Sequence, residues 1–279
     1  MTLTEFGQRY GPWALITGAS EGTGSAFALR LADEGISSIL VARREGPLEE
    51  TAEKLRAKGV QCMTVTADLS DPKAAEVIAT GAAAVGQDNI GLFIANAGAD
   101  SNGALFLDGD IADWDRLVQL NVGTTMRLAH HFGRSLRARG KGGIILVGSG
   151  ACYGGLSGIA VYSAAKGFLL NLGEALWAEL RHHGVDVLNL ILSRTDTPAH
   201  RKLMERNGQP IPADMASPEA VAEMGLAQLA QGPDYNWGQA NDVAGYAPNS
   251  PEDRRARIVT IERMSRAYAG HGQGGGHGE

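Results

Sequence analysis

The chain has 279 residues, is 44% hydrophobic and carries a formal net charge of −6. This length predicts a single domain, over residues 1–269, that is large enough to bury a substantial core. An acidic chain without a long Lys/Arg run does not suit nucleic acid, because that affinity comes mostly from neutralised phosphates. No segment approaches about 18 uninterrupted apolar residues, so we expect neither a membrane-spanning helix nor a membrane partner.

Two cysteines, Cys62 and Cys152, are too few for a disulfide framework and lie in no metal-ligand spacing. We therefore predict a reducing, cytoplasmic location and no metal site. The first ten residues lack a basic region followed by an apolar stretch, so no secretion signal is expected. The two pairs of adjacent histidines do not suggest a metal, because neighbouring residues on a helix point about 100° apart.

Short apolar runs that suit strands alternate with helical segments along the chain. Strands are predicted over 13–17, 38–42, 62–66, 90–95, 144–147 and 185–192, and helices over 22–34, 48–58, 72–85, 112–137, 157–182 and 217–231. This alternation predicts an α/β fold: a single Rossmann-like, doubly wound parallel sheet of six to seven strands with helices on both faces. Ligands bind such sheets at the carboxyl ends of the strands, where the strand order reverses.

Three segments lack a clear periodic pattern. Residues 193–212 have mixed polarity and several loop formers, which predicts a mobile substrate flap over the carboxyl edge of the sheet. Residues 232–251 are loop-like and hide any seventh strand. The tail, residues 270–279, contains six Gly and two His and is predicted to be disordered rather than a metal site.

Residues 13–24 form a strand pattern that enters a glycine-rich turn and then a helix. Gly18, Gly22 and Gly24, with Ser20 and Thr23 between them, let backbone N–H groups and the helix dipole hold a pyrophosphate. The bare glycine spacing recurs in the tail without a preceding strand, so the strand makes this signal specific. The alternative is a plain strand–helix turn.

The second predicted strand ends in Arg43 and Arg44, at the position that approaches the adenosine ribose in dinucleotide folds. Guanidinium groups there favour the 2′-phosphate of NADP (NADPH), whereas a carboxylate would favour NAD. Glu21 is a contrary signal that keeps NAD as an alternative, and a solvated helix start is another interpretation of the arginines. Asp68-Leu69 ends the third strand, where the carboxylate contacts an adenine amino group or simply caps a loop.

Tyr162 and Lys166 are four positions apart, so they share one face if they lie on one helix. A lysine ammonium close to the phenol would lower its pKa from about 10. Together with Ser149, 13 residues upstream, this pair predicts a proton donor beside a bound carbonyl. The alternative is a surface helix with a tyrosine and a solvent-directed lysine.

Taken in order, these motifs resemble the short-chain dehydrogenase/reductase family, over roughly residues 13–198. The glycine turn resembles the cofactor turn of the family, Asp68-Leu69 its adenine contact and Asn96-Ala97-Gly98 its turn after the fourth strand. Asn121 stands at the position of the family's helix asparagine. The resemblance implies four catalytic residues: Asn121, Ser149, Tyr162 and Lys166.

The resemblance also implies a role for each of these residues. Tyr162 donates a proton to the carbonyl oxygen during reduction, and Ser149 orients and polarises that oxygen. Lys166 binds the nicotinamide ribose and lowers the pKa of Tyr162, while Asn121 holds a water that continues the proton relay. Thr195 and Thr197 join the cofactor set, and Thr197 is expected to bond the carboxamide.

The sequence departs from the family pattern at several positions. Thr23 replaces an aliphatic residue between two glycines, and Ser193-Arg194 replaces Pro-Gly after the sixth strand. The usual apolar seventh strand with an acidic-Gly-Gly ending is not visible. These last two departures fall on the substrate side of the site, where Ala151, Tyr153 and Leu203 are expected to line the pocket.

Two residues of the cofactor set have other interpretations. Asn96 is more typical of a turn that holds sheet edges together, and Gly98 is expected to make room for the adenosine ribose. Tyr153, expected in the substrate pocket, could instead be a core or rim aromatic.

The helix after Tyr162 is apolar on more than one side, which favours a homodimer or homotetramer over burial within one subunit.

Together these patterns predict an NADP-dependent carbonyl reductase or alcohol dehydrogenase. The substrate would be a small-molecule ketone or secondary alcohol, of medium size and partly hydrophobic. The alternatives are an NAD-preferring dehydrogenase of the same fold, a non-catalytic nucleotide-sensing protein, and an epimerase or dehydratase on the same scaffold.

Overall fold

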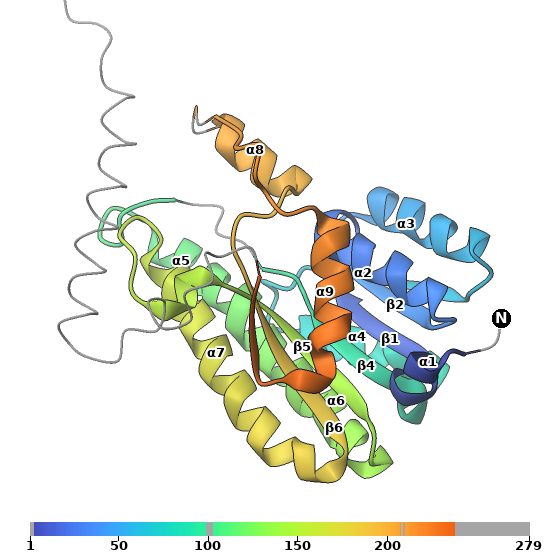
Figure 1. Ribbon diagram of the computed structural model, residues 1–279. Helices are drawn as coiled ribbons and strands as arrows, with labels where there is room; N and C mark the ends of the chain where they lie inside the picture. Colours follow the sequence, from blue (N-terminus) through green and yellow to red (C-terminus); the bar gives the residue numbers. More distant parts are fainter. Residues whose placement is uncertain (1–2, 99–102, 207, 209, 238–279) are drawn as a thin grey trace, which may run out of the picture.

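The computed structural model describes residues 3–98, 103–206, 208 and 210–237, which form a three-layer α/β unit (Figure 1). Its central sheet has seven parallel strands in the order β3-β2-β1-β4-β5-β6-β7. The strands are β1 (Trp13–Thr17), β2 (Ser37–Ala42), β3 (Cys62–Thr66), β4 (Ile90–Ala95), β5 (Gly142–Ser149), β6 (Val185–Leu192) and β7 (Asp234–Trp237). The predicted doubly wound parallel sheet is therefore confirmed.

The strand order reverses between β1 and β4. The chain proceeds from β1 to β2 and β3 in one direction, then crosses back to place β4 on the other side of β1. Loops leaving neighbouring strands diverge at such a point, and the crevice between them is where doubly wound sheets bind ligands. The glycine turn after β1 and the Asn96 turn after β4 both lie there.

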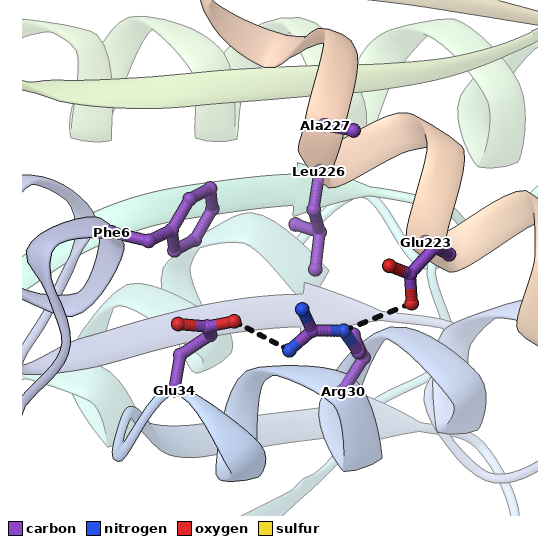
Figure 2. Close-up of a pocket in the computed structure, with 6 residues that line it drawn as sticks. All are labelled: Phe6, Arg30, Glu34, Glu223, Leu226 and Ala227. Atoms are coloured by element: carbon purple, nitrogen blue, oxygen red, sulfur yellow. Dashed lines mark hydrogen bonds and ion pairs between the residues drawn. The ribbon is translucent and has the colours of Figure 1, made fainter.

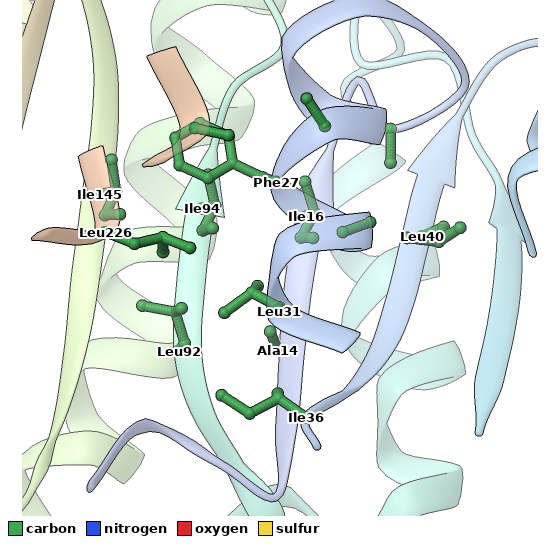
Figure 3. Close-up of a cluster of buried hydrophobic side chains, with 14 of the residues drawn as sticks. Ala14, Ile16, Phe27, Leu31, Ile36, Leu40, Leu92, Ile94, Ile145 and Leu226 are labelled. Atoms are coloured by element: carbon green, nitrogen blue, oxygen red, sulfur yellow. The ribbon is translucent and has the colours of Figure 1, made fainter. Parts of the chain in front are cut away.

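Helices α1 (Glu5–Tyr10), α2 (Gly22–Asp33), α3 (Glu45–Ala57) and α9 (Pro218–Gln228) contribute to the core on one face of the sheet. Figure 3 shows this core, where Phe27 and Leu31 of α2 meet Ile16, Ile94 and Ile145 from the strands. Side chains alternate along a strand, so the neighbouring residues face the opposite core. That second core includes α4 (Ala74–Ala82), α6 (Thr124–Arg139) and α7 (Ala160–Leu180).

The structure corrects the prediction that residues 112–137 form one helix. The segment divides into α5 (Ile111–Val118), a π-helical segment (Gln119–Gly123) and α6. The extra residue of a π-helical turn rotates the following side chains relative to the preceding helix. Asn121 lies inside this turn and is fully buried.

Other element boundaries also differ from the predictions. Residues 193–212 contain α8 (Pro198–Arg206), so this segment is partly helical. The loop-like region from residue 232 contains β7, a strand of four residues that aligns with β6 from Asn189 to Leu192. α1 was not predicted; it is a short helix whose N-terminus is capped by the Thr4 hydroxyl. The predicted tail, 270–279, and residues 238–251 of the loop lie outside the described residues.

Candidate active site

The turn after β1 has the conformation that its glycines predict. Gly18 has φ 67° and Gly22 has φ 58°, both in the left-handed region that favours glycine. A Cβ on Gly24 would lie only 2.2 Å from the carbonyl oxygen of Gly18. Helix α2 can therefore approach the end of β1 only with glycine at this position. The N-terminus of such a helix suits an anionic group.

The start of α2 also has suitable electrostatics. Glu21 occupies the N-cap but makes no side-chain hydrogen bond to the helix, and the first turn holds no acidic residue. The Glu21 carboxylate instead lies 2.8 Å from the Arg44 guanidinium. Ser20 and Thr23 lie within the glycine turn, where Ser20 is half-buried and Thr23 is buried. This arrangement has the residues needed to hold a pyrophosphate at the helix N-terminus.

Asn96 joins the ends of β1 and β4. Its Nδ2 donates to the carbonyl oxygens of Thr17 and Gly18, each at 3.1 Å. The backbone N–H groups of Asn96 and Ala97 donate to the Thr17 hydroxyl, at 3.1 and 3.2 Å. These bonds agree with the interpretation of Asn96 as a turn residue that holds sheet edges together.

The end of β2 brings Arg43 and Asp68 near each other. The Arg43 side chain is 75% exposed, and its Nη1 lies 4.0 Å from Oδ2 of Asp68. Hydrogen bonds from the Ser70 hydroxyl and backbone N–H lower the pKa of Asp68. Leu69 is buried, and its carbonyl oxygen accepts from the Thr124 hydroxyl at 2.7 Å. Asp68 is therefore a loop cap in this structure, with a second oxygen directed toward Arg43.

Tyr162 and Lys166 lie on α7, as their spacing predicts, and Nζ of Lys166 lies 5.5 Å from the centre of the Tyr162 ring. Lys166 is only 3% exposed and donates to the Val147 carbonyl oxygen at 3.0 Å. Burial lowers the pKa of Lys166 to about 8, while Cys152 acts in the opposite direction. The surface-helix alternative is wrong for Lys166, because its ammonium is buried against the end of β5.

Gly98 connects this lysine to Asn121. A Cβ on Gly98 would lie 2.6 Å from Oδ1 of Asn121 and 2.9 Å from Nζ of Lys166. The two polar atoms therefore flank the same backbone position, at the switch point of the sheet. Nδ2 of Asn121 donates to the Leu117 carbonyl oxygen at 3.0 Å, which fixes the orientation of the amide.

Ser149 is the last residue of β5, and its hydroxyl accepts from the Ala151 N–H at 3.3 Å. Ala151 is buried, and Tyr153 ends the short 3₁₀ turn that follows Ser149. The Tyr153 hydroxyl donates to Oδ1 of Asn236 in β7 at 2.8 Å. The turn after the serine is thus tied both to Ser149 and to the edge strand.

The segment after β6 reaches back to the glycine turn. A Cβ on Gly22 would lie 3.0 Å from Cγ2 of Thr197, so these two residues are in close contact. The Thr197 hydroxyl accepts from the His200 N–H, and Thr195 is buried in a bridge to Ala216. Leu203 is half-buried on α8, which lies beyond the carboxyl edge of the sheet in Figure 1.

The family model of the short chain dehydrogenases matches residues 12–208. The chain belongs to the short chain dehydrogenase family. It is 30% identical over 260 residues to a 7beta-hydroxysteroid dehydrogenase from Clostridium sardiniense, covering 93% of this chain and 97% of that protein. The predicted family and oxidoreductase class are therefore confirmed.

Two solved structures of short-chain dehydrogenases resemble the fold and carry a nicotinamide cofactor. The Sphingobium yanoikuyae enzyme in complex with NADPH is 25% identical, with a TM-score of 0.71, and the match covers 96% of this chain and 99% of that one. The Mycobacterium paratuberculosis enzyme bound to NAD is also 25% identical, with a TM-score of 0.70 and coverage of 84% and 98%. Both cofactors therefore occur on this fold.

Several predicted site residues of this short chain dehydrogenase meet at the switch point. Asn121, Lys166 and Gly98 are in mutual proximity, and Thr197 contacts the glycine turn. Arg44 is paired with Glu21, a contact that the sequence did not predict. Asn236 was missed, although the alternation of polar and aromatic residues over 234–237 is the signal of a strand.

Figure 2 shows a pocket elsewhere on the molecule, between α1, α2 and α9. Arg30 lies at its centre and pairs with both Glu34 and Glu223. Its volume of about 90 Å³ is far below that of ligand sites. Among the described residues, no cluster of His, Cys, Asp and Glu could hold a metal, and no helix is long and apolar enough to cross a membrane.

Proposed function

We propose that this short-chain dehydrogenase is an NADP-dependent carbonyl reductase or alcohol dehydrogenase in which Tyr162 is the acid and base. One observation supports it most: Asn121, Lys166 and Gly98 meet at the switch point, with Ser149 and Tyr162 on the adjoining strand end and helix turn. These side chains come from a π-helical segment, α7 and β5. A bound nicotinamide cofactor supplies the hydride.

Each side chain has a task in the reduction of a ketone. The hydroxyl of Tyr162 donates its proton to the carbonyl oxygen, and the Ser149 hydroxyl donates a hydrogen bond that orients the same oxygen. Lys166, whose pKa of about 8 leaves it mostly protonated at neutral pH, stabilises the phenolate and holds the cofactor ribose. Asn121 continues the proton path from Lys166 to solvent. Oxidation reverses each step.

The remaining cofactor residues follow from their positions. The pyrophosphate is held by the glycine turn: Gly18, Ser20, Gly22, Thr23 and Gly24. The adenosine is surrounded by the residues after β3 and β4: Asp68, Leu69, Asn96, Ala97 and Gly98. Thr197 bonds the carboxamide and Thr195 belongs to the same cofactor shell; the contact of Thr197 with Gly22 supports a place for this segment beside the cofactor turn.

The decisive experiment replaces Tyr162 with Phe. NADPH oxidation is measured with a panel of ketones, and NADPH binding is measured by fluorescence. We expect a loss of at least about 10²-fold in kcat with unchanged NADPH affinity, because only the proton donor is removed. Absence of turnover with every ketone in the unmodified protein would contradict the proposal and favour a non-catalytic nucleotide-sensing protein.

The preference for NADP rests on Arg43 and Arg44. The exposed Arg43 guanidinium is available to a 2′-phosphate, and the ion pair with Arg44 neutralises the repulsive charge of Glu21. The second candidate is an NAD-preferring enzyme, which the position of Glu21 at the start of α2 favours.

Arg43→Ala separates the two cofactor proposals. We expect KM for NADPH to rise about tenfold or more with KM for NADH nearly unchanged, since only NADPH carries the phosphate. Arg56→Ala is the matched control, because Arg56 is an exposed arginine of α3 that pairs with Glu49. Equal effects of Arg43→Ala on both cofactors would support NAD.

The substrate proposal is a ketone or secondary alcohol on a partly apolar skeleton. Ala151, Tyr153 and Leu203 lie in the turn after Ser149 and on α8, so they supply a mainly apolar wall. The name of the Clostridium sardiniense relative refers to a hydroxysteroid, which is a secondary alcohol on a bulky ring system. A ketone panel ordered by size tests this preference.

We also propose a cytoplasmic homodimer or homotetramer. Neither Cys62 nor Cys152 forms a disulfide, in agreement with a reducing compartment. Phe168 on α7 is 39% exposed and Met126 on α6 is 41% exposed. Apolar side chains that a second subunit would cover are exposed in this way when one subunit is considered alone. Light scattering that gives the mass of one chain, 29.3 kDa, would contradict the oligomer.

A further inference from the structure

The edge strand β7 presents two polar side chains to one face of the sheet. Tyr235 and Trp237 pack against the core on the α9 side. Side chains alternate along a strand, so Asp234 and Asn236 face the α7 side. The hydrogen bonds agree with this: Nδ2 of Asn189 in β6 donates to Oδ1 of Asp234 at 2.7 Å and to the Leu170 carbonyl oxygen of α7 at 3.0 Å.

Asn236, the second polar residue, reaches the turn that follows Ser149. Its Oδ1 accepts the Tyr153 hydroxyl at 2.8 Å, across a sequence separation of 83 residues. The same turn is fixed at its other end, where the Ala151 N–H donates to the Ser149 hydroxyl. Tyr153 is therefore held at its hydroxyl by β7 and at its backbone by the serine turn.

This arrangement determines which part of Tyr153 a substrate can use. Burial raises the pKa of Tyr153 to about 12, and Asp234 and Glu174 act in the same direction, whereas the bond to Asn236 acts against it. The phenol is thus neutral at neutral pH, and its proton is donated to Asn236. The half-buried ring, rather than the hydroxyl, is the part of Tyr153 that suits contact with an apolar group.

We propose that Asn236 is a positioning residue that fixes the Tyr153 ring in the wall of the substrate site, so that the enzyme favours ketones with a bulky apolar group beside the carbonyl. The inference rests on the proposed function, because it takes Ser149 as the contact of the carbonyl oxygen. Tyr153 ends the turn that bonds the Ser149 hydroxyl, and its side chain is half-buried, so we take its ring as the wall of the site on that side of the carbonyl.

The test compares two ketones that differ in bulk, 1-decalone and butan-2-one, with NADPH. The quantity measured is the ratio of their kcat/KM values in the unmodified enzyme, Asn236→Ala, Tyr153→Phe and the double variant. We expect each single change to lower the decalone preference about tenfold, mainly through KM, because the ring loses its fixed position. The double variant should lose no more than either single variant, since all three remove the same bond.

Two further variants separate positioning from general loosening of the strand. Asn236→Asp keeps an acceptor oxygen on a side chain of the same length, so it should restore most of the preference. Asp234→Ala removes the bond from β7 to Asn189 but leaves the bond between Tyr153 and Asn236 in place, so the preference should stay unchanged. Melting temperatures identify any variant that fails to fold. If Asn236→Ala fails to fold, Tyr153→Phe still removes the same hydrogen bond, from the side of its donor.

The inference is overturned if Asp234→Ala lowers the preference as much as Asn236→Ala, or if the two single changes are additive. It is also overturned if both variants keep the preference of the unmodified enzyme, a result that leaves the proposed function intact. Failure of the unmodified enzyme to reduce either ketone or any other would instead contradict the proposed function itself.

Discussion

Gly98 separates two polar atoms at the centre of the site. The sequence suggested that this glycine makes room for the adenosine ribose, but a Cβ here would meet Oδ1 of Asn121 and Nζ of Lys166. The absent side chain thus leaves space between an amide oxygen and an ammonium. A water in a proton path needs this kind of polar, small space.

Gly98→Ala is expected to lower kcat at least about 100-fold, because the added methyl group displaces Lys166 or Asn121 from its position. The loss of stability should be moderate, about 1–3 kcal/mol, as for other overpacked sites. Steady-state kinetics and thermal unfolding measure the two effects. Gly155→Ala is the matched control, since a Cβ there meets no atom of the described residues within 4 Å; equal losses in both variants would refute the assignment.

Lys166 predicts a pH dependence of cofactor binding. Its pKa of about 8 lies below the ordinary value of 10.5, so the side chain loses its charge as pH rises through 8. We expect the Kd of NADPH to increase between pH 7 and pH 10, by up to about tenfold, because a cationic contact is lost. Fluorescence titration measures this, and Lys166→Met should give a flat profile; an equally steep profile in that variant would exclude Lys166 as the cause.

At the scale of elements, α1 is attached to the edge of the sheet opposite the site. The Tyr10 hydroxyl donates to Oδ2 of Asp186 at 2.6 Å, and Arg9 pairs with the same carboxylate. Tyr10 is only 3% exposed, and burial raises its pKa. A helix of six residues gains little stability from its own hydrogen bonds, so this contact with β6 and the packing of Tyr10 and Phe6 against the core hold α1 in place.

Asp186→Ala should lower the free energy of unfolding by about 1–3 kcal/mol, because the buried Tyr10 hydroxyl loses its acceptor. The kcat should be unaffected, since Asp186 is the second residue of β6 and the site lies at the strand's other end. Urea unfolding and steady-state kinetics test both statements. Asp33→Ala, which removes a surface pair with Lys58, should cost less than about 0.5 kcal/mol. A similar cost for both would contradict the attachment.

For the whole molecule, the sheet separates two hydrophobic cores. Ile144 and Ile145 are neighbours in β5, yet Ile144 belongs to the α6 side and Ile145 to the α9 side. Both are fully buried. Because no side chain crosses the sheet, a cavity on one face cannot be filled from the other.

Ile144→Val and Ile145→Val should each cost about 0.5–1.5 kcal/mol, and the double variant should cost their sum. A control pair on one face, Ile144→Val with Leu146→Ala, should deviate from additivity because both residues share one core. Urea unfolding gives all the values. Coupling above about 0.5 kcal/mol between Ile144 and Ile145 would show that the two cores are not independent.

The sequence was most informative where a local pattern and a conformational requirement coincide. Gly18 and Gly22 adopt positive φ, which only glycine accepts readily, so their role was visible in the strand–turn–helix pattern. Tyr162 and Lys166 share a helix face through their spacing alone. The strand β7 was missed although polar and aromatic residues alternate over 234–237, because an alternation of only four residues is a weak signal.

The sequence by itself determined the α/β class, the parallel sheet and the identity of the catalytic candidates, because periodicity and helix spacing act within a few residues. Only the tertiary structure decided that Lys166 is buried against Val147, that Glu21 pairs with Arg44, and that Asn236 holds Tyr153. Each of these contacts joins residues 19 to 83 positions apart. Such pairs become neighbours only when the strands align, so chain folding rather than local pattern places them.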